Sequence, residues 1–130
     1  MNELNEAQLL ADRQSMEEAF RKGFGAMQNY VTDWAERKGW NQAYRERPLE
    51  KDGETIALEH SELSEALEGM RHGNPASDKI PDFSSIEEEY ADLIIRIMHH
   101  AGVRGFDIAN ALIVKMAYNE KRPFMHGKKF

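Results

Sequence analysis

The sequence predicts an all-α fold, an antiparallel bundle of four to five helices. Apolar residues recur three or four positions apart in several segments, and no segment reads as a convincing β-strand. The linkers between these segments are short, which favours antiparallel neighbours in a helical bundle. A chain of 130 residues is long enough to bury a core as one domain.

The composition excludes several classes of protein. Hydrophobic residues make up 41% and charged residues 31% of the chain, a balance typical of a folded globular protein rather than a disordered one. No apolar run approaches the roughly 20 residues of a membrane span, and the opening segment, MNELNEAQLLADRQ, is too polar for a signal peptide. The net charge of −6 argues against nucleic-acid binding. The lack of cysteine excludes disulfides and thiolate sites, and we expect a cytoplasmic protein without membrane or nucleic-acid partners.

The first half of the chain predicts two helices and a loop. Residues 5 to about 22 form the first helix, with a break or kink near Gly23 and Gly25, because glycine costs a helix about 1 kcal/mol relative to alanine. Residues 26–38 form the second helix, which Gly39 ends as a C-terminal cap. A loop is expected next, because a residue before proline disfavours helix, as in Arg47-Pro48.

The second half predicts three more helices with clear ends. The third runs from about residue 53 to 72 and stops at the breaker sequence HGNP. The fourth begins after two serines and ends near Gly102 or Gly105, and the last runs from 108 to about 121, with Asp107 as its N-cap. Two serine–glutamate pairs match the capping box at the start of the fourth helix: Ser84/Glu87 and Ser85/Glu88.

Two acidic pairs of the same pattern lie on the third and fourth helices. They are Glu59-x-x-Glu62 and Glu89-x-x-Asp92. Residues three apart stand one turn from each other on one side of a helix, so each pair presents two carboxylates together. Two such pairs on facing helices are costly to bury unless cations neutralise them. The pattern therefore predicts a site for a hard divalent cation such as Mg²⁺, with Mn²⁺ as a substitute.

A helical wheel separates these acids from their neighbours. Glu59 falls within an apolar stripe and Glu62 at its edge, whereas Glu65 and Glu68 fall well outside it and are expected to be solvated. The stripe of the third helix comprises Ile56, Leu63, Ala66, Leu67 and Met70. Glu89 and Asp92 flank the stripe of the fourth helix, which comprises Ile86, Tyr90, Leu93, Ile97 and Ala101. These stripes are expected to face the core and to bury Glu59.

The last helix and the tail are basic. Lys115 and Asn119 share a stripe with Ile108 and Leu112, so we expect them on the core-facing side, where the lysine either reaches water or binds a phosphate. Five basic residues and one acid follow from Lys115 to the end of the chain. Upstream, the aromatic residues Tyr30, Trp34 and Trp40 are expected to lie in the core or an interface, or one of them to stack on a planar ligand.

Taken together, these motifs resemble the MazG-like nucleotide pyrophosphohydrolases of the all-α NTP pyrophosphatase superfamily. The matching words are Glu59-His-Ser-Glu62-Leu, Glu89-Tyr-Ala-Asp92-Leu and Lys115-Met-Ala-Tyr-Asn119-Glu-Lys-Arg122. The resemblance covers about residues 30–123, including WAERKGW. We expect residues 1–130 to form a single domain. Within it, residues 1–25 are an N-terminal helical extension and residues 124–130 a basic tail, both outside the resemblance. The resemblance implies Mg²⁺-dependent cleavage of a (d)NTP between the α and β phosphates, giving a (d)NMP and pyrophosphate.

The resemblance also implies roles for individual residues. The four acids of the two pairs would be metal ligands, with Glu59 and Glu62 the candidate catalytic residues. Lys115, Asn119 and Arg122 would meet the phosphates, and Trp40 is a candidate substrate contact. Some members carry an acidic residue just before the first pair that serves as a base, but this chain has Leu58 there, so the general base stays open. The family also forms dimers or dimers of dimers.

Two other classes compete with this interpretation. A di-iron carboxylate bundle needs Glu-x-x-His pairs, and no histidine of this chain has a glutamate three positions earlier: His60, His72, His99, His100 and His126. A non-catalytic nucleotide-binding or interaction module remains the open alternative. Ile95 and Met98 lie off the stripe of their own helix, and such a second apolar surface favours a homo-oligomer.

Overall fold

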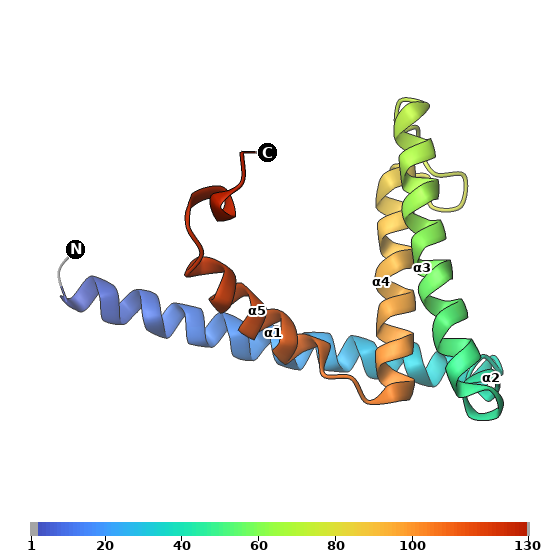
Figure 1. The fold of residues 1–130 in the computed structure, drawn as a ribbon, viewed down its shortest axis with the longest axis horizontal. Coiled ribbons are helices and arrows are strands. Elements are labelled where there is room, and N and C mark those ends of the chain that lie inside the picture. The colour runs from blue at the N-terminus through green and yellow to red at the C-terminus, as the bar shows by residue number, and fades with distance from the viewer. Residues whose placement is uncertain (1–2, 130) are drawn as a thin grey trace. The chain divides into compact units, whose positions relative to one another are not determined.

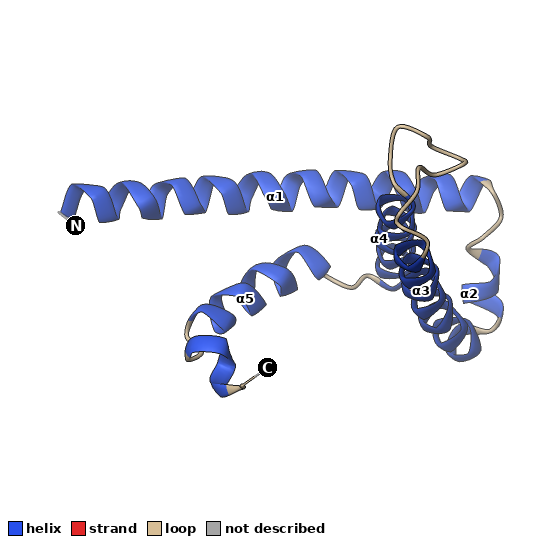
Figure 2. Ribbon diagram, turned by 90° about the horizontal axis from the view of Figure 1, so that it is seen from above, coloured by secondary structure: helices blue, strands red, loops and turns tan. Residues whose placement is uncertain are grey.

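The computed structural model describes residues 3–129 and confirms the all-α fold (Figure 1). Helices joined by loops and turns account for this part of the chain, and none of it forms a β-strand (Figure 2). The elements are α1 (Glu3–Arg37), α2 (Gln42–Glu46), α3 (Pro48–Arg71), α4 (Ser85–Arg104), α5 (Ile108–Glu120) and the 3₁₀ helix η1 (Phe124–Gly127).

The chain divides into two compact units. One comprises Met1–Met27 with Phe106–Phe130, and the other is the continuous segment Gln28–Gly105. Helix α1 contributes its first part to one unit and its last turns to the other. The two acidic pairs and both tryptophans belong to the 28–105 unit, whereas Lys115, Asn119 and Arg122 belong to the other.

Helix α1 runs without the break that Gly23 and Gly25 predict. That prediction is wrong because a cost of about 1 kcal/mol per glycine does not outweigh the hydrogen bonds of a long helix with good helix formers on both sides. The helix ends as predicted at Gly39, which has a φ of 81°. The N–H of Gly39 donates to Glu36 O and that of Trp40 to Ala35 O, both at 3.0 Å, which is a Schellman motif.

The segment between α1 and α3 is more helical than the sequence predicts. The short helix α2 lies in the expected loop, and α3 begins at Pro48 rather than near residue 53. Proline suits the first turn because the N–H that it lacks has no partner inside the helix there. The effect of proline on its predecessor is still visible, since Arg47 adopts φ −136° and ψ 64°, outside the helical region.

Helices α3 and α4 lie side by side and run antiparallel, which forms the hairpin that carries both acidic pairs (Figures 1 and 2). The predicted capping box starts α4. Glu87 N–H donates to the Ser84 hydroxyl at 3.3 Å, and Ser84 N–H donates to the Glu87 carboxylate at 2.7 Å. The alternative pair is not the cap, because Glu88 instead accepts a hydrogen bond from the Ser77 hydroxyl. Gly105, with a φ of 69°, ends the helix.

The buried core of the described residues is small and consists largely of alanine. Its hydrophobic members are Val31, Ala35, Tyr44, Ala66, Met98, Ala101 and Ala109. Half of the ten predicted stripe residues are exposed instead, four on α3 and one on α4: Ile56, Leu63, Leu67, Met70 and Tyr90. Met98 was expected on a second surface but is buried, whereas Ile95 is exposed as expected. None of the described helices has the length and apolarity to cross a membrane.

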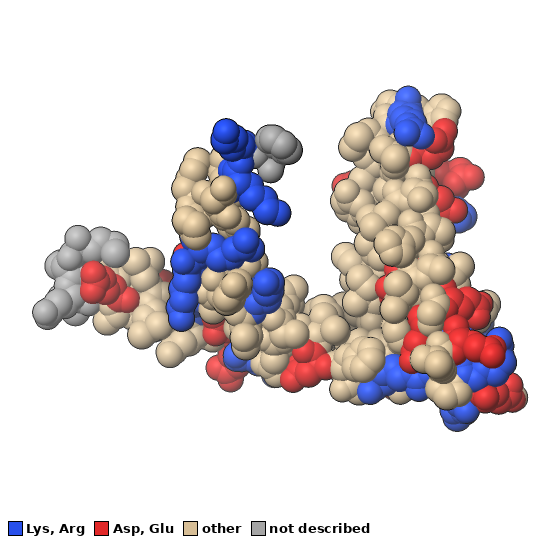
Figure 3. All heavy atoms as spheres, viewed as in Figure 1, with Lys and Arg blue, Asp and Glu red and all other residues tan. Residues whose placement is uncertain are grey.

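In the other unit, α5 is held to the first part of α1 by polar contacts. Arg13 Nη1 lies 2.9 Å from Glu120 Oε2, and Arg21 Nε donates to Asn110 Oδ1 at 2.6 Å. The Asp107 cap forms as predicted, with its carboxylate accepting the Asn110 N–H at 3.2 Å. Lys115 is exposed, with Nζ 4.6 Å from the Tyr118 ring centroid, so its expected core-facing position is wrong. Lysine and arginine gather over α5 and the residues after it (Figure 3).

Candidate metal centre

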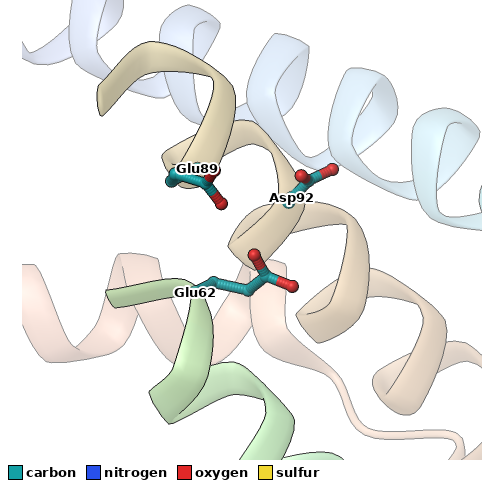
Figure 4. A group of neighbouring side chains, drawn as sticks. All are labelled: Glu62, Glu89 and Asp92. Carbon is teal, nitrogen blue, oxygen red and sulfur yellow. The ribbon is translucent and has the colours of Figure 1, made fainter. Parts of the chain in front are cut away.

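Three of the four predicted ligands meet between α3 and α4. Glu62 on α3 points toward Glu89 and Asp92 on α4, and each residue offers a carboxylate oxygen within 4.8 Å of the other two (Figure 4). The capping box fixes where α4 begins. The three-residue spacing then sets Glu89 and Asp92 one turn apart, on the side that faces α3. Such a group of carboxylates could hold a metal ion.

The electrostatics of the group favour a cation. Burial raises the pKa of Glu89 to about 8, and contacts with Glu62 and Glu65 add to the effect. Burial also raises the pKa of Asp92, reinforced by the negative charge of Glu62. Glu62 is the exception. Burial acts to raise its pKa, but the hydrogen bond from Arg96 and the contacts with Glu89 and Glu65 outweigh it and lower the pKa. Packed this closely, the carboxylates repel one another unless a proton or a cation intervenes.

An unused acceptor supports the same conclusion. Oε2 of Glu89 is inaccessible to solvent and accepts no hydrogen bond from any described residue. Buried carboxylate oxygens normally have a partner, because leaving one unsatisfied costs free energy. The donor set consists only of oxygen atoms, which is what a hard divalent cation requires. The residues present therefore fit a hard cation.

Glu59, the fourth predicted ligand, lies outside this group. It is half-buried on α3, and burial raises its pKa while the positive charges of His100 and Arg96 act in the opposite direction. The wheel placed Glu59 deeper than Glu62, but the structure reverses the order, since only 6% of Glu62 is exposed. The residues that α3 buries are Thr55, Glu62 and Ala66, not its large apolar residues.

Glu65 is exposed, as predicted, and it also stands next to the group. It contacts both Glu62 and Glu89 closely enough to influence their pKa values. It stands one turn after Glu62 on α3, and this i, i+3 spacing is the same signal that identified the two predicted pairs. The sequence therefore held evidence for a third acidic residue on this face of the helix.

A cavity of about 540 Å³ opens beside the carboxylates. Glu62, Glu65 and Asp92 line one part of it. Trp34, Trp40 and Tyr44 supply aromatic surface, and Trp40 is 58% exposed. The cavity also contains three cationic side chains that the sequence motifs did not single out: Lys51, Lys79 and Arg96.

The remaining predicted site residues lie in the other unit. Lys115 and Arg122 are on α5 and just after it, and Asn119 carries a buried Oδ1 that accepts no hydrogen bond from the described residues. Their role beside the carboxylates stays a prediction.

No family model matches this chain, and neither does any curated protein or solved structure. The fold and the site define the class: an all-α protein with a carboxylate group between two antiparallel helices and a mixed aromatic and cationic cavity beside it.

Proposed function

We propose that this protein is a Mg²⁺-dependent nucleoside triphosphate pyrophosphohydrolase that cleaves a (d)NTP to a (d)NMP and pyrophosphate. The observation that carries the proposal is a three-carboxylate group, two of whose members line a cavity together with three cations and two tryptophans. A nucleotide needs these three environments: a cation site for the phosphates, positive side chains for their remaining charge, and flat apolar surface for the base. The sequence motifs that resemble the MazG-like family point to the same activity.

In this proposal each group of residues has a distinct task. Mg²⁺ held by Glu62, Glu89 and Asp92 would supply positive charge to the phosphates and promote ionisation of a water molecule. The water oxygen forms a bond to the α-phosphorus, the bond from that phosphorus to the α–β bridging oxygen breaks, and pyrophosphate leaves. Glu59 is suited to accept the proton of the water, because it stands one turn before Glu62 on α3 and burial raises its pKa.

The aromatic side of the cavity suits a nucleobase. Trp40 and Trp34 both line it and keep 58% and 39% of their surface exposed, so their rings are available for stacking. In the same proposal Lys115, Asn119 and Arg122 bind phosphate oxygens, as the resemblance implies, and the protein acts in the cytoplasm.

The physical form of the enzyme is proposed to be a homodimer or a dimer of dimers. No large side chain in the described part of the chain is fully buried. Eight large apolar residues of α3 and α4 stay exposed: Leu49, Ile56, Leu63, Leu67, Met70, Tyr90, Ile94 and Ile95. Figure 3 shows a largely uncharged surface over this hairpin. A second copy that packs the same surface against it would complete a four-helix core, which a core built mainly from alanine cannot provide alone.

The test is a panel of canonical and modified NTPs and dNTPs with Mg²⁺ or Mn²⁺, with products identified as monophosphate and pyrophosphate or as diphosphate and phosphate. Glu62→Gln, Asp92→Asn and Glu59→Gln should each abolish metal-stimulated pyrophosphate release while the helical circular dichroism signal persists. Glu68→Gln, at an exposed acid on the same helix, is the matched control. Undiminished turnover in Glu62→Gln or Asp92→Asn would contradict the proposal. Nucleotide binding without turnover by the wild-type protein would assign the chain to the non-catalytic alternative.

A further inference from the structure

Arg96 of α4 is bonded to the carboxylate group and also lines the cavity. Its Nε donates to Glu62 Oε1 at 2.7 Å, and its side chain keeps 38% of its surface exposed and lines the cavity. Asp92 stands one turn earlier on the same helix, so the arginine projects from the face that carries the acidic residues. It therefore touches a candidate metal ligand and the space for the substrate at the same time.

The charge of Arg96 acts on two of the three carboxylates of the group, Glu62 and Asp92, and on Glu59. Its positive charge works to lower the pKa of Asp92 and of Glu59, in addition to its direct hydrogen bond with Glu62. Three ionised carboxylates and one divalent cation leave a net charge of about −1, which repels a polyphosphate. A guanidinium at this place cancels that excess.

Two hydrogen-bonding nitrogens of Arg96 are unused by the protein. Only Nε is engaged, and Nη1 and Nη2 donate to no other group among the side chains and backbone described for residues 5–129. Arg104, eight residues further along α4, differs because more than one of its nitrogens donates within the protein. Its Nε donates to Asp52 at 2.7 Å and its Nη2 to the Pro48 carbonyl at 2.9 Å, so it is used to join α4 to the start of α3. Glu62 holds Nε of the guanidinium, which leaves Nη1 and Nη2 available. This planar pair of donors matches the oxygens of a phosphate group.

The two lysines of the cavity are placed differently. Lys51 Nζ lies 3.4 Å from Glu54 and 5.6 Å from the Tyr44 ring centroid, and Lys79 Nζ lies 3.4 Å from Glu88. Each is paired with an acid outside the carboxylate group. Arg96 is the cavity cation that is bonded to a candidate metal ligand.

We propose that Arg96 is a substrate-binding residue, whose Nε holds Glu62 while its Nη nitrogens donate to a phosphate group of the nucleotide. The inference rests on the proposed function and adds a phosphate contact within the 28–105 unit to the three proposed earlier, Lys115, Asn119 and Arg122. It also gives Glu62 a second task, since one oxygen orients the arginine and the other remains for the cation.

The experiment compares Arg96→Gln and Arg96→Lys with the wild-type protein and with Arg104→Gln as the matched control. Calorimetry measures the affinity for Mn²⁺ alone, then for inorganic pyrophosphate and for α,β-imido deoxynucleoside triphosphates in the presence of Mn²⁺. Arg96→Gln should weaken pyrophosphate and nucleotide binding by about 10- to 100-fold, the range expected for lost charge-assisted hydrogen bonds. Mn²⁺ affinity should change by less than about threefold. Arg96→Lys should recover only part of the loss, because an ammonium group cannot hold Glu62 and a phosphate as a fork does.

Each other outcome counts against the assignment. Unchanged pyrophosphate affinity in Arg96→Gln, with normal binding by the wild-type protein, overturns the role of Arg96 and leaves the proposed function standing. An equal loss in Arg104→Gln, or a loss of Mn²⁺ affinity and helical signal in Arg96→Gln, shows a structural role instead. Wild-type protein that binds neither pyrophosphate nor any of the analogues removes the proposed function and this inference together.

Discussion

Glu62 and Glu89 offer carboxylate oxygens within 4.8 Å of each other across the α3–α4 hairpin, and the buried Oε2 of Glu89 lacks a hydrogen-bond partner in the described structure. Burial raises the pKa of Glu89 to about 8, whereas the Arg96 hydrogen bond helps keep Glu62 ionised. At neutral pH the pair therefore carries one proton, on Glu89. A bound cation would take the place of this proton in neutralising the charge. This arrangement makes stability depend on pH and on metal in a defined direction.

Metal-depleted protein should become less stable as the pH rises. The pKa of Glu89 is about 8 in the folded protein and lies near its ordinary value of 4.5 in the unfolded chain. Between these values the folded state holds a proton that the unfolded state releases, so the free energy of unfolding falls as pH rises from about 4.5 to about 8. Urea unfolding in EDTA at pH 5.5 and pH 8 measures this slope. Mg²⁺ should restore stability at pH 8, by about 2.7 kcal/mol at one hundred times its Kd.

The control for this prediction is Glu89→Gln, which keeps the shape of the side chain and cannot ionise. It should flatten the pH dependence between pH 5.5 and 8 and abolish most of the stabilisation by Mg²⁺. A wild-type slope that persists in Glu89→Gln would assign the pH dependence to other groups.

Gly102→Ala should destabilise the 28–105 unit. A Cβ at this position would lie 1.9 Å from Thr32 Oγ1 and 3.0 Å from Thr32 Cβ, which is too close without movement of α4 or of the end of α1. Overpacking of this kind costs about 1–3 kcal/mol. Chemical denaturation monitored by circular dichroism measures the effect. The double variant with Thr32→Ala should recover part of the lost stability, because it removes the closest atom; no recovery would contradict the steric explanation.

Gly23→Ala should have the opposite effect. A Cβ at Gly23 meets no atom within 4 Å, and the residue lies inside the uninterrupted helix α1. Alanine in place of glycine in an exposed helix stabilises by up to about 1 kcal/mol. The melting temperature should therefore rise, and a fall would indicate that α1 bends at this point in solution.

The sequence predicted the helix ends better than the helix faces. Gly39, Ser84, Gly105 and Asp107 all end or begin helices where local rules place them, because capping depends on residues within one turn. The glycines of α1 and the loop before Pro48 were misjudged, because local penalties of about 1 kcal/mol are small beside the cooperativity of a long helix. Boundaries that depend on one strong local interaction are therefore predictable, and those that depend on a balance of weak ones are not.

The faces were misjudged for a different reason. A helical wheel finds the apolar side of α3 correctly but does not say which neighbour covers it. The stripe through Leu63 and Leu67 stays exposed, while the polar side with Glu62 packs on α4. A stripe that meets a second copy of the chain has the same pattern as one that meets its own core. Three acids of the site were identifiable from spacing. Arg96 follows Asp92 by one turn and was visible by the same rule, whereas Lys79 lies in a loop that carries no periodic signal.

The exposed stripe leads to the last prediction, on self-association. Leu67 is 49% exposed on α3 within the apolar surface of the hairpin. If two copies meet there, Leu67→Glu places two carboxylates in the interface and should convert the dimer to monomer, with a loss of thermal stability, because the small core then stands alone. Size-exclusion chromatography with multi-angle light scattering measures the mass against 15.0 kDa for one chain.

Val114→Glu, at a residue 68% exposed on α5, adds the same charge outside this surface and should leave the mass unchanged. A wild-type protein that is a stable monomer would remove the proposed self-association. A Leu67→Glu variant that stays dimeric would place the interface on another surface. Because both outcomes are read from mass rather than from activity, the result decides the form of the protein independently of its substrate.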